Sequence, residues 1–386
     1  MIRLSLAPIV VVSLLFAGCA SGRYGPKAST KAPEGPHTLK KLSLEERQLL
    51  LQRAHVWQPI ATSSLNLAAG PDLPAAMRIG QLTMCTFVFP DKPLTGNTPK
   101  FLCEIRKGDA AKVKYDAKNG EVYGEVAATR LLWALGFKSD VMVPTLISCR
   151  GCPPDPFTAS TVNWSLGNPA DTATRTFEPA VIERPIAGRS IEVDGFEGWA
   201  WPELDKLGQR GGGATRAEID AFKLLAVFIQ HSDSKPDQQD IICGDTKFRI
   251  DGQGNETCGL PWLVIKDLGA TFGKATRLNS SKMTLADWDS VPVWKDAAQC
   301  VGDLPRSVTG SLENPKISEA GRRFLAQRLR LLKDRQLRDL FAVANVERRG
   351  ETLTGADGSK RKVTIDDWVR VFKKKRSEIV AAHCPA

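Results

Sequence analysis

Four stretches of the sequence carry side chains that could handle a phosphate group and a metal ion. Residues 112–115 end a predicted strand in Lys-Val-Lys-Tyr, and the helix predicted after it carries Glu121 and Glu125. Residues 231–239 form a polar stretch, and residues 263–269 form an apolar strand that ends in Asp-Leu-Gly. Phosphoryl transfer develops negative charge on phosphate oxygens, so its catalysis depends on cations and positioning. Lysines, carboxylates and amide oxygens are the groups that such chemistry needs.

Each stretch also has an ordinary interpretation when taken alone. A lysine on a strand, such as Lys114, is commonly solvated, and Asp-Leu-Gly is a common turn after a strand. Residues 233–239 are rich in turn formers and could be a polar loop. The order of the four stretches along the chain therefore carries more information than any one of them.

In that order the stretches resemble the protein-kinase-like superfamily, nearest to its lipid-kinase, toxin-kinase and secretory-pathway-kinase branch. The resemblance implies that Lys114 holds the nucleotide phosphates and that Glu125 of the next helix holds Lys114. Lys112 is the alternative lysine, because side chains alternate along a strand. Glu121, four residues before Glu125, is the alternative partner.

The resemblance assigns the catalytic roles to the later stretches. It implies that Asp233 is the base for the acceptor hydroxyl, that Lys235 steadies the γ-phosphate, and that Asp267 and Gln238 bind Mg²⁺ or Mn²⁺ beside ATP. Gln239 is the alternative amide ligand. The strand containing Glu183 lies where the adenine-binding segment between the lobes is expected.

Three features depart from the family pattern. No Gly-x-Gly-x-x-Gly loop precedes Lys114, and the candidate for that position is the short turn at residues 93–100. Gln238 stands where the family has Asn, which moves the amide oxygen by about 1 Å because a methylene is added. Leu268 stands in place of Phe.

The elements that would position these residues come in a simple order. Ser43 and Glu46 form a capping box at the start of a predicted helix. Strand patterns fill residues 80–115, a strong helix covers 120–137, and strands follow at 141–148 and 180–184. From residue 215 the pattern is mainly helical, with β-runs at 241–250 and 260–269. The predicted fold class is α+β, a two-lobed protein-kinase-like fold with a small β-rich N-lobe and a larger helical C-lobe.

The predicted organisation has five parts. They are a lipoprotein signal peptide (1–18), a flexible tether (19–40), an N-terminal helical extension (41–79), the N-lobe (80–185) and the C-lobe (186–386). The apolar run at residues 4–17 is shorter than the roughly 20 residues of a membrane-spanning helix. It ends in Ala-Gly before Cys19, which resembles the lipobox of bacterial lipoproteins and makes Cys19 the predicted lipidation residue. An ordinary signal peptide with an incidental cysteine is the alternative.

The remaining eight cysteines form an even set, which in an exported chain favours disulfides. Cys243 and Cys258 bracket a Gly/Asp-rich turn, as a hairpin crosslink would. Cys149 and Cys152 have the spacing of a zinc or redox site, but only one such pair exists and histidines are few, so a local disulfide is preferred.

The whole chain has 53 basic and 43 acidic residues, and the basic excess is concentrated at residues 370–376. That run predicts a solvated helix face, with contact to anionic lipid headgroups as the functional alternative. Export argues against a nucleic-acid partner. The expected partners are the membrane, through the lipid on Cys19, and an unidentified protein, lipid or glycan acceptor. The expected location is the periplasmic side of the cell envelope, at the outer membrane.

The sequence therefore predicts a lipid-anchored, kinase-like protein that binds Mg-ATP and transfers its γ-phosphoryl group to a hydroxyl. The alternative is an inactive, pseudokinase-like envelope protein that binds a ligand or a protein partner. ATP is scarce outside the cytoplasm, and Gln238 replaces Asn; both points favour this alternative.

Overall fold

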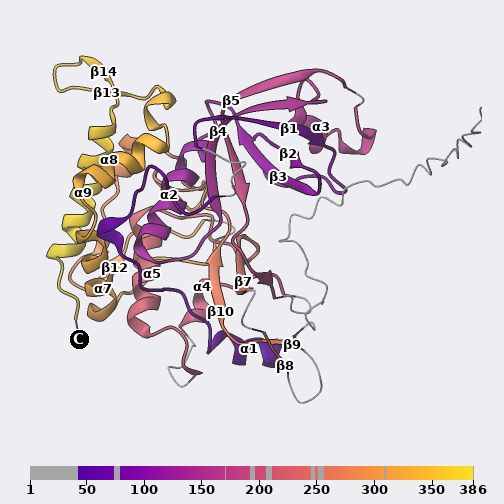
Figure 1. The fold of residues 1–386 in the computed structure, drawn as a ribbon. Coiled ribbons are helices and arrows are strands. Elements are labelled where there is room, and N and C mark those ends of the chain that lie inside the picture. The colour runs from indigo at the N-terminus through magenta and orange to yellow at the C-terminus, as the bar shows by residue number, and fades with distance from the viewer. Residues whose placement is uncertain are drawn as a thin grey trace, which may run out of the picture.

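The computed structural model describes residues 42–73, 79–169, 171–191, 196–205, 211–244, 248–250, 256–307 and 310–385. Helices and strands are both abundant in these residues, so the α+β class is confirmed. A strand-rich part comes first, and a mainly helical part follows it (Figure 1). The predicted signal peptide, the tether and Cys19 lie outside the described residues.

The strand-rich part is a closed barrel in the order β1-β2-β3-β5-β4. Neighbouring strands are antiparallel except β1 and β4, whose parallel pairing closes the barrel. The strands are β1 (Leu82–Val88), β2 (Lys100–Arg106), β3 (Asp109–Tyr115), β4 (Val141–Arg150) and β5 (Thr174–Arg184). All the strands predicted between residues 80 and 184 are present, and β5 begins earlier than predicted.

Alternation along β3 decides which residues reach the candidate site. Ala111 and Val113 are buried in the hydrophobic cluster of the barrel. Successive side chains of a strand point to opposite faces, so Lys112 and Lys114 lie on the other face. That face is covered by helix α2 (Glu121–Leu135), and Lys114 is buried there.

Helix α2 ends where the sequence predicts. Gly136 caps it with a left-handed φ of 91°, and a Cβ at this position would lie 2.2 Å from the carbonyl oxygen of Gln58. Both the conformation and the close approach therefore require glycine. Nearly all of α2 is buried, because it packs against β4 and β5 of the barrel and against α8 of the helical part.

The helical part is built around α5, α7, α8 and α9, which pack in the pairs α5–α7, α7–α9 and α8–α9. Its core is rich in aromatic rings, including Trp288, Phe341, Trp368 and Phe372. Two of these helices, α7 and α8, are separated only by residues 331–333. The helices are α4 (Trp201–Leu204), α5 (Arg216–Phe228), α6 (Leu285–Ser290), α7 (Glu319–Arg330), α8 (Asp334–Val343) and α9 (Ile365–Ala381).

Short sheets accompany these helices. A three-stranded sheet has the order β10-β7-β6, and the remaining strands form two-stranded pairs. These strands are β6 (Arg189–Ser190), β7 (Gln239–Cys243), β8 (Phe248–Ile250), β9 (Glu256–Cys258), β10 (Pro261–Ile265), β11 (Trp294–Asp296), β12 (Val301–Gly302), β13 (Thr352–Thr354) and β14 (Lys360–Lys362). The hairpin β13–β14 was not predicted.

The segment that precedes the barrel packs on the helical part. Helix α1 (Leu44–Leu51) begins with the predicted capping box, in which the Ser43 and Glu46 side chains each accept the other's main-chain N–H. Leu50 and Leu51 belong to the main hydrophobic cluster, and Arg47 pairs with Glu203 at the start of α4. The remaining short helices are η1 (Thr62–Ser64), α3 (Pro156–Ser160), η2 (Trp164–Leu166), η4 (Pro236–Gln238) and η5 (Val346–Arg349).

The eight cysteines expected to pair form four disulfides. Cys149 bonds to Cys152, so the local disulfide predicted for that spacing is confirmed, and the predicted hairpin crosslink between Cys243 and Cys258 is present. The other pairs are Cys85–Cys103 and Cys300–Cys384. Disulfides are compatible with a location outside the cytoplasm.

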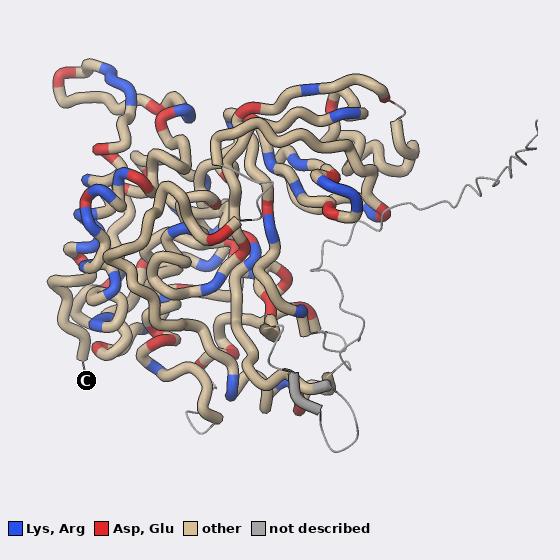
Figure 2. Tube along the Cα trace, in the orientation of Figure 1, with Lys and Arg blue, Asp and Glu red and all other residues tan. Residues whose placement is uncertain are grey.

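The basic run at residues 370–376 lies on α9 and is largely paired within the molecule. Lys374 contacts Asp289 at 2.6 Å, and Lys373 contacts Asp334 at 2.6 Å. Lys375 is buried and donates to the carbonyl oxygen of Val291. The prediction of a wholly solvated face is therefore wrong at Lys375. Figure 2 shows acidic and basic positions side by side among these helices. Little unpaired charge is left in the run for lipid headgroups.

Candidate functional site

Lys114 is the centre of the candidate site. Its side chain is 1% exposed, and its ammonium lies 2.6 Å from Glu125 Oε1 and 3.0 Å from Glu121 Oε2. Asp267 Oδ1 is 3.6 Å away, and Glu183 Oε2 is 3.9 Å away. Carboxylates from three separate parts of the chain thus surround one buried ammonium.

Local structure explains why these groups meet. Glu121 and Glu125 are one turn apart on α2, so both face β3. Asp267 follows β10, and its Oδ1 accepts the main-chain N–H of Gly269 at 3.0 Å. A Cβ on Gly269 would lie 2.6 Å from Cγ and Cδ of Glu121, so glycine at this position leaves room for the Glu121 side chain as it is placed here.

The charges of this cluster are strongly coupled. Burial raises the pKa of Glu125 well above its usual value, although Lys114 opposes the shift, and the charge of Asp267 adds to it. Burial would also raise the pKa of Asp267, but the Lys114 ammonium and a hydrogen bond from Glu125 outweigh it and hold that pKa well below its usual range. The two carboxyl groups are therefore coupled, and Asp267 keeps its charge more readily than Glu125 does.

The polar stretch after α5 lies beside Asp267. The main-chain N–H groups of Lys266 and Asp267 donate to the carbonyl oxygen of Gln238 at 2.9 and 3.4 Å. Gln238 Nε2 donates to Asp233 Oδ2 at 2.9 Å, so Gln238 connects the two aspartates assigned to catalysis. Its other amide atom, Oε1, is buried and has no hydrogen-bond partner among the described residues.

The side chains of Gln239 and Lys235, two further residues of this loop, make polar contacts within the loop itself. Gln239 is fully buried and donates to the carbonyl oxygens of Ser234 and Lys235, so it holds the loop together. Lys235 is one-third exposed and lies 3.9 Å from Asp237. No contact joins Lys235 to the Lys114 cluster within the described ranges.

His231 is buried, and burial lowers its pKa to about 4, so the ring is neutral and behaves as a packing residue at neutral pH.

Some of these residues could hold a divalent cation. Single carboxylate oxygens of Glu121, Glu125 and Asp267 lie within 4.8 Å of one another. The unpartnered Oε1 of Gln238 is an amide oxygen, and amide and carboxylate oxygens suit Mg²⁺. The donor set therefore fits a hard cation near Asp267.

Glu183, the residue predicted to lie in the adenine-binding segment, pairs with the other lysine of β3. Its Oε1 lies 2.5 Å from the Lys112 ammonium, directly opposite on the neighbouring strand. Lys112 is therefore paired with Glu183, which leaves Lys114 as the lysine of the central cluster. The main-chain N–H of Ile186, just after β5, donates to Asp140 at 3.0 Å.

The sequence interpretation missed Lys100 and Thr98. Lys100 starts β2, is 8% exposed, and pairs in register with Lys114 of β3. Thr98 Oγ1 donates to Glu121 Oε2 at 3.0 Å. The register of the β2–β3 hairpin could have located Lys100, because directly opposite residues share a face of the sheet.

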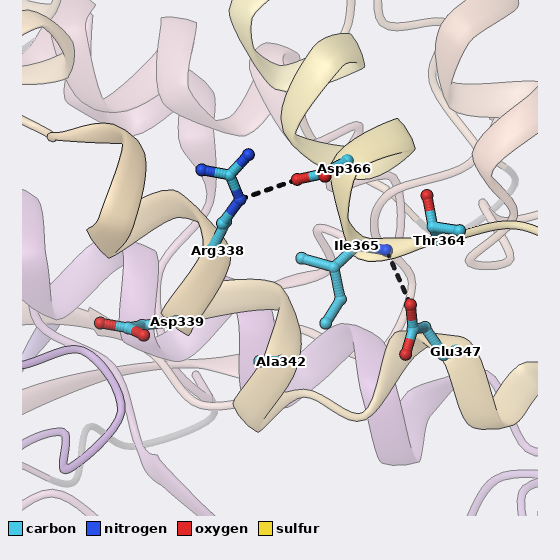
Figure 3. A pocket seen from close by; sticks show the side chains of 7 residues that line it. All are labelled: Arg338, Asp339, Ala342, Glu347, Thr364, Ile365 and Asp366. Atoms are coloured by element: carbon cyan, nitrogen blue, oxygen red, sulfur yellow. Dashed lines mark hydrogen bonds and ion pairs between the residues drawn. The ribbon is translucent and has the colours of Figure 1, made fainter.

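Other features stay outside the site. A hollow of about 310 Å³ between α8, η5 and α9 is shown in Figure 3, where Arg338 pairs with Asp366 and Glu347 accepts the N–H of Ile365. Its polar groups serve local structure, and it lies apart from the Lys114 cluster. Trp199 and Trp201 are fully buried and pack against Phe222. Of the helices in the described residues, none is long and apolar enough to span a bilayer.

The comparisons with known proteins give only a weak structural similarity. No family model matches the sequence, and no curated protein matches it. Among solved structures, the proinflammatory kinase CtkA of Helicobacter pylori aligns with 79% of this chain and 96% of its own, at 8% identity and a TM-score of 0.39. That score is too low to assign a fold.

Proposed function

We propose that this chain has a two-lobed protein-kinase-like fold, binds ATP with Mg²⁺ or Mn²⁺ at the Lys114 cluster, and transfers the γ-phosphoryl group to a hydroxyl of a protein, lipid or glycan. The observation that carries the proposal is the convergence on Lys114 of Glu121 and Glu125 from α2 and Asp267 from the Asp-Leu-Gly turn. These are the residue types that phosphoryl transfer requires, brought together from distant parts of the sequence.

The order of elements supports the same proposal. Helix α2 lies between β3 and β4 and supplies the partner of the β3 lysine, and β5 leads from the barrel to the helical part. The loop containing Asp233 and the turn containing Asp267 both belong to the helical part and lie side by side. A nucleotide bound at Lys114 would therefore lie between the barrel and the helical part.

Each site residue has a definite task in this proposal. Glu125 holds Lys114 in place at 2.6 Å, and Lys114 binds the nucleotide phosphates. The Gln238 amide orients the carboxylate of Asp233, which accepts the proton of the acceptor hydroxyl. Lys235 steadies the γ-phosphate after leaving Asp237, a movement that its one-third exposure allows.

Asp267 and Gln238 are the residues that would hold the cation. When bound there, Mg²⁺ or Mn²⁺ supplies positive charge to the phosphate oxygens. Gln238 Oε1 is buried without a hydrogen-bond partner among the described residues, and a cation would satisfy it.

A second candidate function is nucleotide or ligand binding without transfer. It is favoured by Gln238 itself, which stands where the family that the motifs resemble has Asn and whose extra methylene displaces the amide oxygen. Under either function we propose that the chain is anchored through a lipid on Cys19, on the periplasmic side of the outer membrane. Proteins, lipids and glycans of the envelope are then the acceptors or partners within reach.

Phosphate transfer from labelled ATP tests the first function against the second. The full chain would be incubated with γ-labelled ATP and Mg²⁺ or Mn²⁺, and incorporated and released phosphate would be counted. Asp233→Asn should lower the rate by about 10² to 10⁴, the usual contribution of a general base. Glu313→Gln, at an exposed position outside the proposed site, should leave the rate within about twofold. Equal rates in wild type and Asp233→Asn would refute the assigned base, and ATP binding without any transfer would favour the second function.

A further inference from the structure

Lys100 is a largely buried lysine whose ammonium makes no direct ion pair among the described residues, although Glu121 and Asp267 lie close enough to act on its charge. It is 8% exposed, and its side chain makes no hydrogen bond within the described ranges either. Lys112 and Lys114, by contrast, both contact carboxylates closer than 3 Å. A buried charge without a partner is unfavourable and is retained where a ligand supplies the missing charge.

The β2–β3 register places Lys100 in the candidate site. Lys100 and Lys114 are directly opposite on antiparallel strands, so both side chains lie on the face that α2 covers. Burial lowers the pKa of Lys100, and the neighbouring ammonium of Lys114 lowers it further, while Glu121 opposes the shift. Lys100 thus faces the same cluster, where Lys114 and Lys112 repel its charge and Glu121 and Asp267 attract it.

The turn between β1 and β2 closes over Lys100. A Cβ on Gly96, which has φ of 85°, would lie 2.8 Å from Lys100 Nζ. The hydrogen bond from Thr98 to Glu121 joins the same turn to α2. Glycine therefore lets the main chain of the turn approach the ammonium.

The segment between β4 and β5 holds this turn in place. Leu94 N donates to the carbonyl oxygen of Ser160 at 2.9 Å, and Trp164 Nε1 donates to that of Pro90 at 2.7 Å. The rings of Phe89 and Trp164 are stacked at 6.3 Å. The turn is thus fixed before any ligand arrives, although it lacks a glycine-rich sequence.

We infer that Lys100 binds the non-bridging oxygens of the terminal phosphates of a nucleoside triphosphate, as a second cation beside Lys114 under the β1–β2 turn. The inference rests on the proposed function and adds a residue to its phosphate site. A polyphosphate supplies the direct ion-pair partner that Lys100 lacks among the described residues, and it can contact both lysines at once because they are register partners. In this chain a lysine side chain takes the place of the main-chain amides of a glycine-rich loop.

The test compares phosphate-containing ligands on the full chain. Dissociation constants for ATP, AMP and inorganic tripolyphosphate, each with Mg²⁺, would be measured by calorimetry for wild type, Lys100→Gln, Lys100→Met and Lys92→Gln. Lys92 is an exposed lysine of the same turn and serves as the matched control. We expect Lys100→Gln and Lys100→Met to weaken ATP and tripolyphosphate binding about tenfold or more, with AMP binding and the Lys92→Gln variant unchanged. Without ligand, the melting temperature of Lys100→Met should rise, because an unpaired buried charge is removed.

The outcomes separate this inference from the proposed function. If ATP binds wild type and both Lys100 variants equally, the inference is overturned and the proposed function stands. If tripolyphosphate binding depends on Lys100 but neither ATP nor AMP binds, the phosphate site is supported and the nucleotide function fails. If none of the three ligands binds wild type, both are overturned. A Lys100→Met variant with a lower melting temperature and unchanged ATP binding would assign Lys100 a structural role instead.

Discussion

At the scale of single residues, the sequence predicted the centre of the site better than its edge. The resemblance to kinase-like proteins implied the pairing of Lys114 with Glu125, and left Lys112 and Glu121 as alternatives. It also implied the role of Asp267, which lies 3.6 Å from Lys114 in the structure. Lys100 was missed because only the strand register reveals that it lies opposite Lys114. The pairing of Lys112 with Glu183, likewise, depends on a neighbour 71 residues away.

Asp140 gives a prediction about pH at this scale. It is 4% exposed, its Oδ1 accepts the N–H of Ile186, and burial, helped by the charge of Glu183, raises its pKa to about 8. A folded-state pKa above the unfolded value means that the stabilisation is full below about pH 4 and is lost as pH rises through about 8. Asp140→Asn keeps the acceptor oxygen and removes the titration.

We therefore expect Asp140→Asn to gain stability over wild type as pH rises from 5 to 8. The gain should be on the order of 1 kcal/mol per pH unit. Urea unfolding of both proteins at pH 5, 6.5 and 8 measures it. A constant difference between the two proteins across this range would show that Asp140 does not titrate there.

At the scale of elements, capping residues and hydrophobic periodicity predicted where helices begin and end. The sequence did not show where a helical run is interrupted. The capping box at Ser43 and the glycine after α2 fixed helix ends that the structure reproduces. The break at residues 331–333 carries no glycine or proline; α7 packs on α5 and α8 packs on α2, while both contact α9. The sequence predicts that Lys375 is a surface residue of a basic run, but tertiary packing buries it.

The disulfide between Cys300 and Cys384 should contribute more stability than the other three. It closes 84 residues and ties the end of α9 to the segment before β12, whereas Cys149–Cys152 closes only 3. Loop-closure entropy predicts a loss of about 4.5 kcal/mol for the paired Cys→Ser change at 300 and 384, and about 1.5 kcal/mol at 149 and 152. Denaturant midpoints of the two double variants provide the comparison. An equal loss in both would rule out chain entropy as the main contribution.

At the scale of the whole molecule, the α+β class and the order of a strand-rich part before a helical part followed from the sequence pattern. The closure of the barrel by the parallel pairing of β1 with β4 did not, because it joins strands about 60 residues apart. The basic run on α9 was expected to be a solvated face, but much of its charge is paired with Asp289 and Asp334.

The proposed anchor predicts where the whole molecule resides. Expressed in a Gram-negative host with a palmitate analogue, the full chain should be labelled and should sediment with the outer membrane. Cys19→Ser should lose the label and the lipid-dependent sedimentation, while Cys149→Ser with Cys152→Ser should keep both. An unlabelled wild-type chain would support the alternative, an ordinary signal peptide with an incidental cysteine.

The central claim is that the Lys114 cluster binds a metal–nucleotide complex, and the melting temperature tests it most directly. Wild type and Asp267→Asn would each be heated alone, with Mg²⁺, with ATP, and with both. At about 100 times the dissociation constant, a ligand that binds only the folded state stabilises it by roughly 2.7 kcal/mol. We predict a rise for wild type that needs both Mg²⁺ and ATP and is lost in Asp267→Asn. No rise in wild type at millimolar Mg-ATP, or the same rise in both proteins, would contradict the claim.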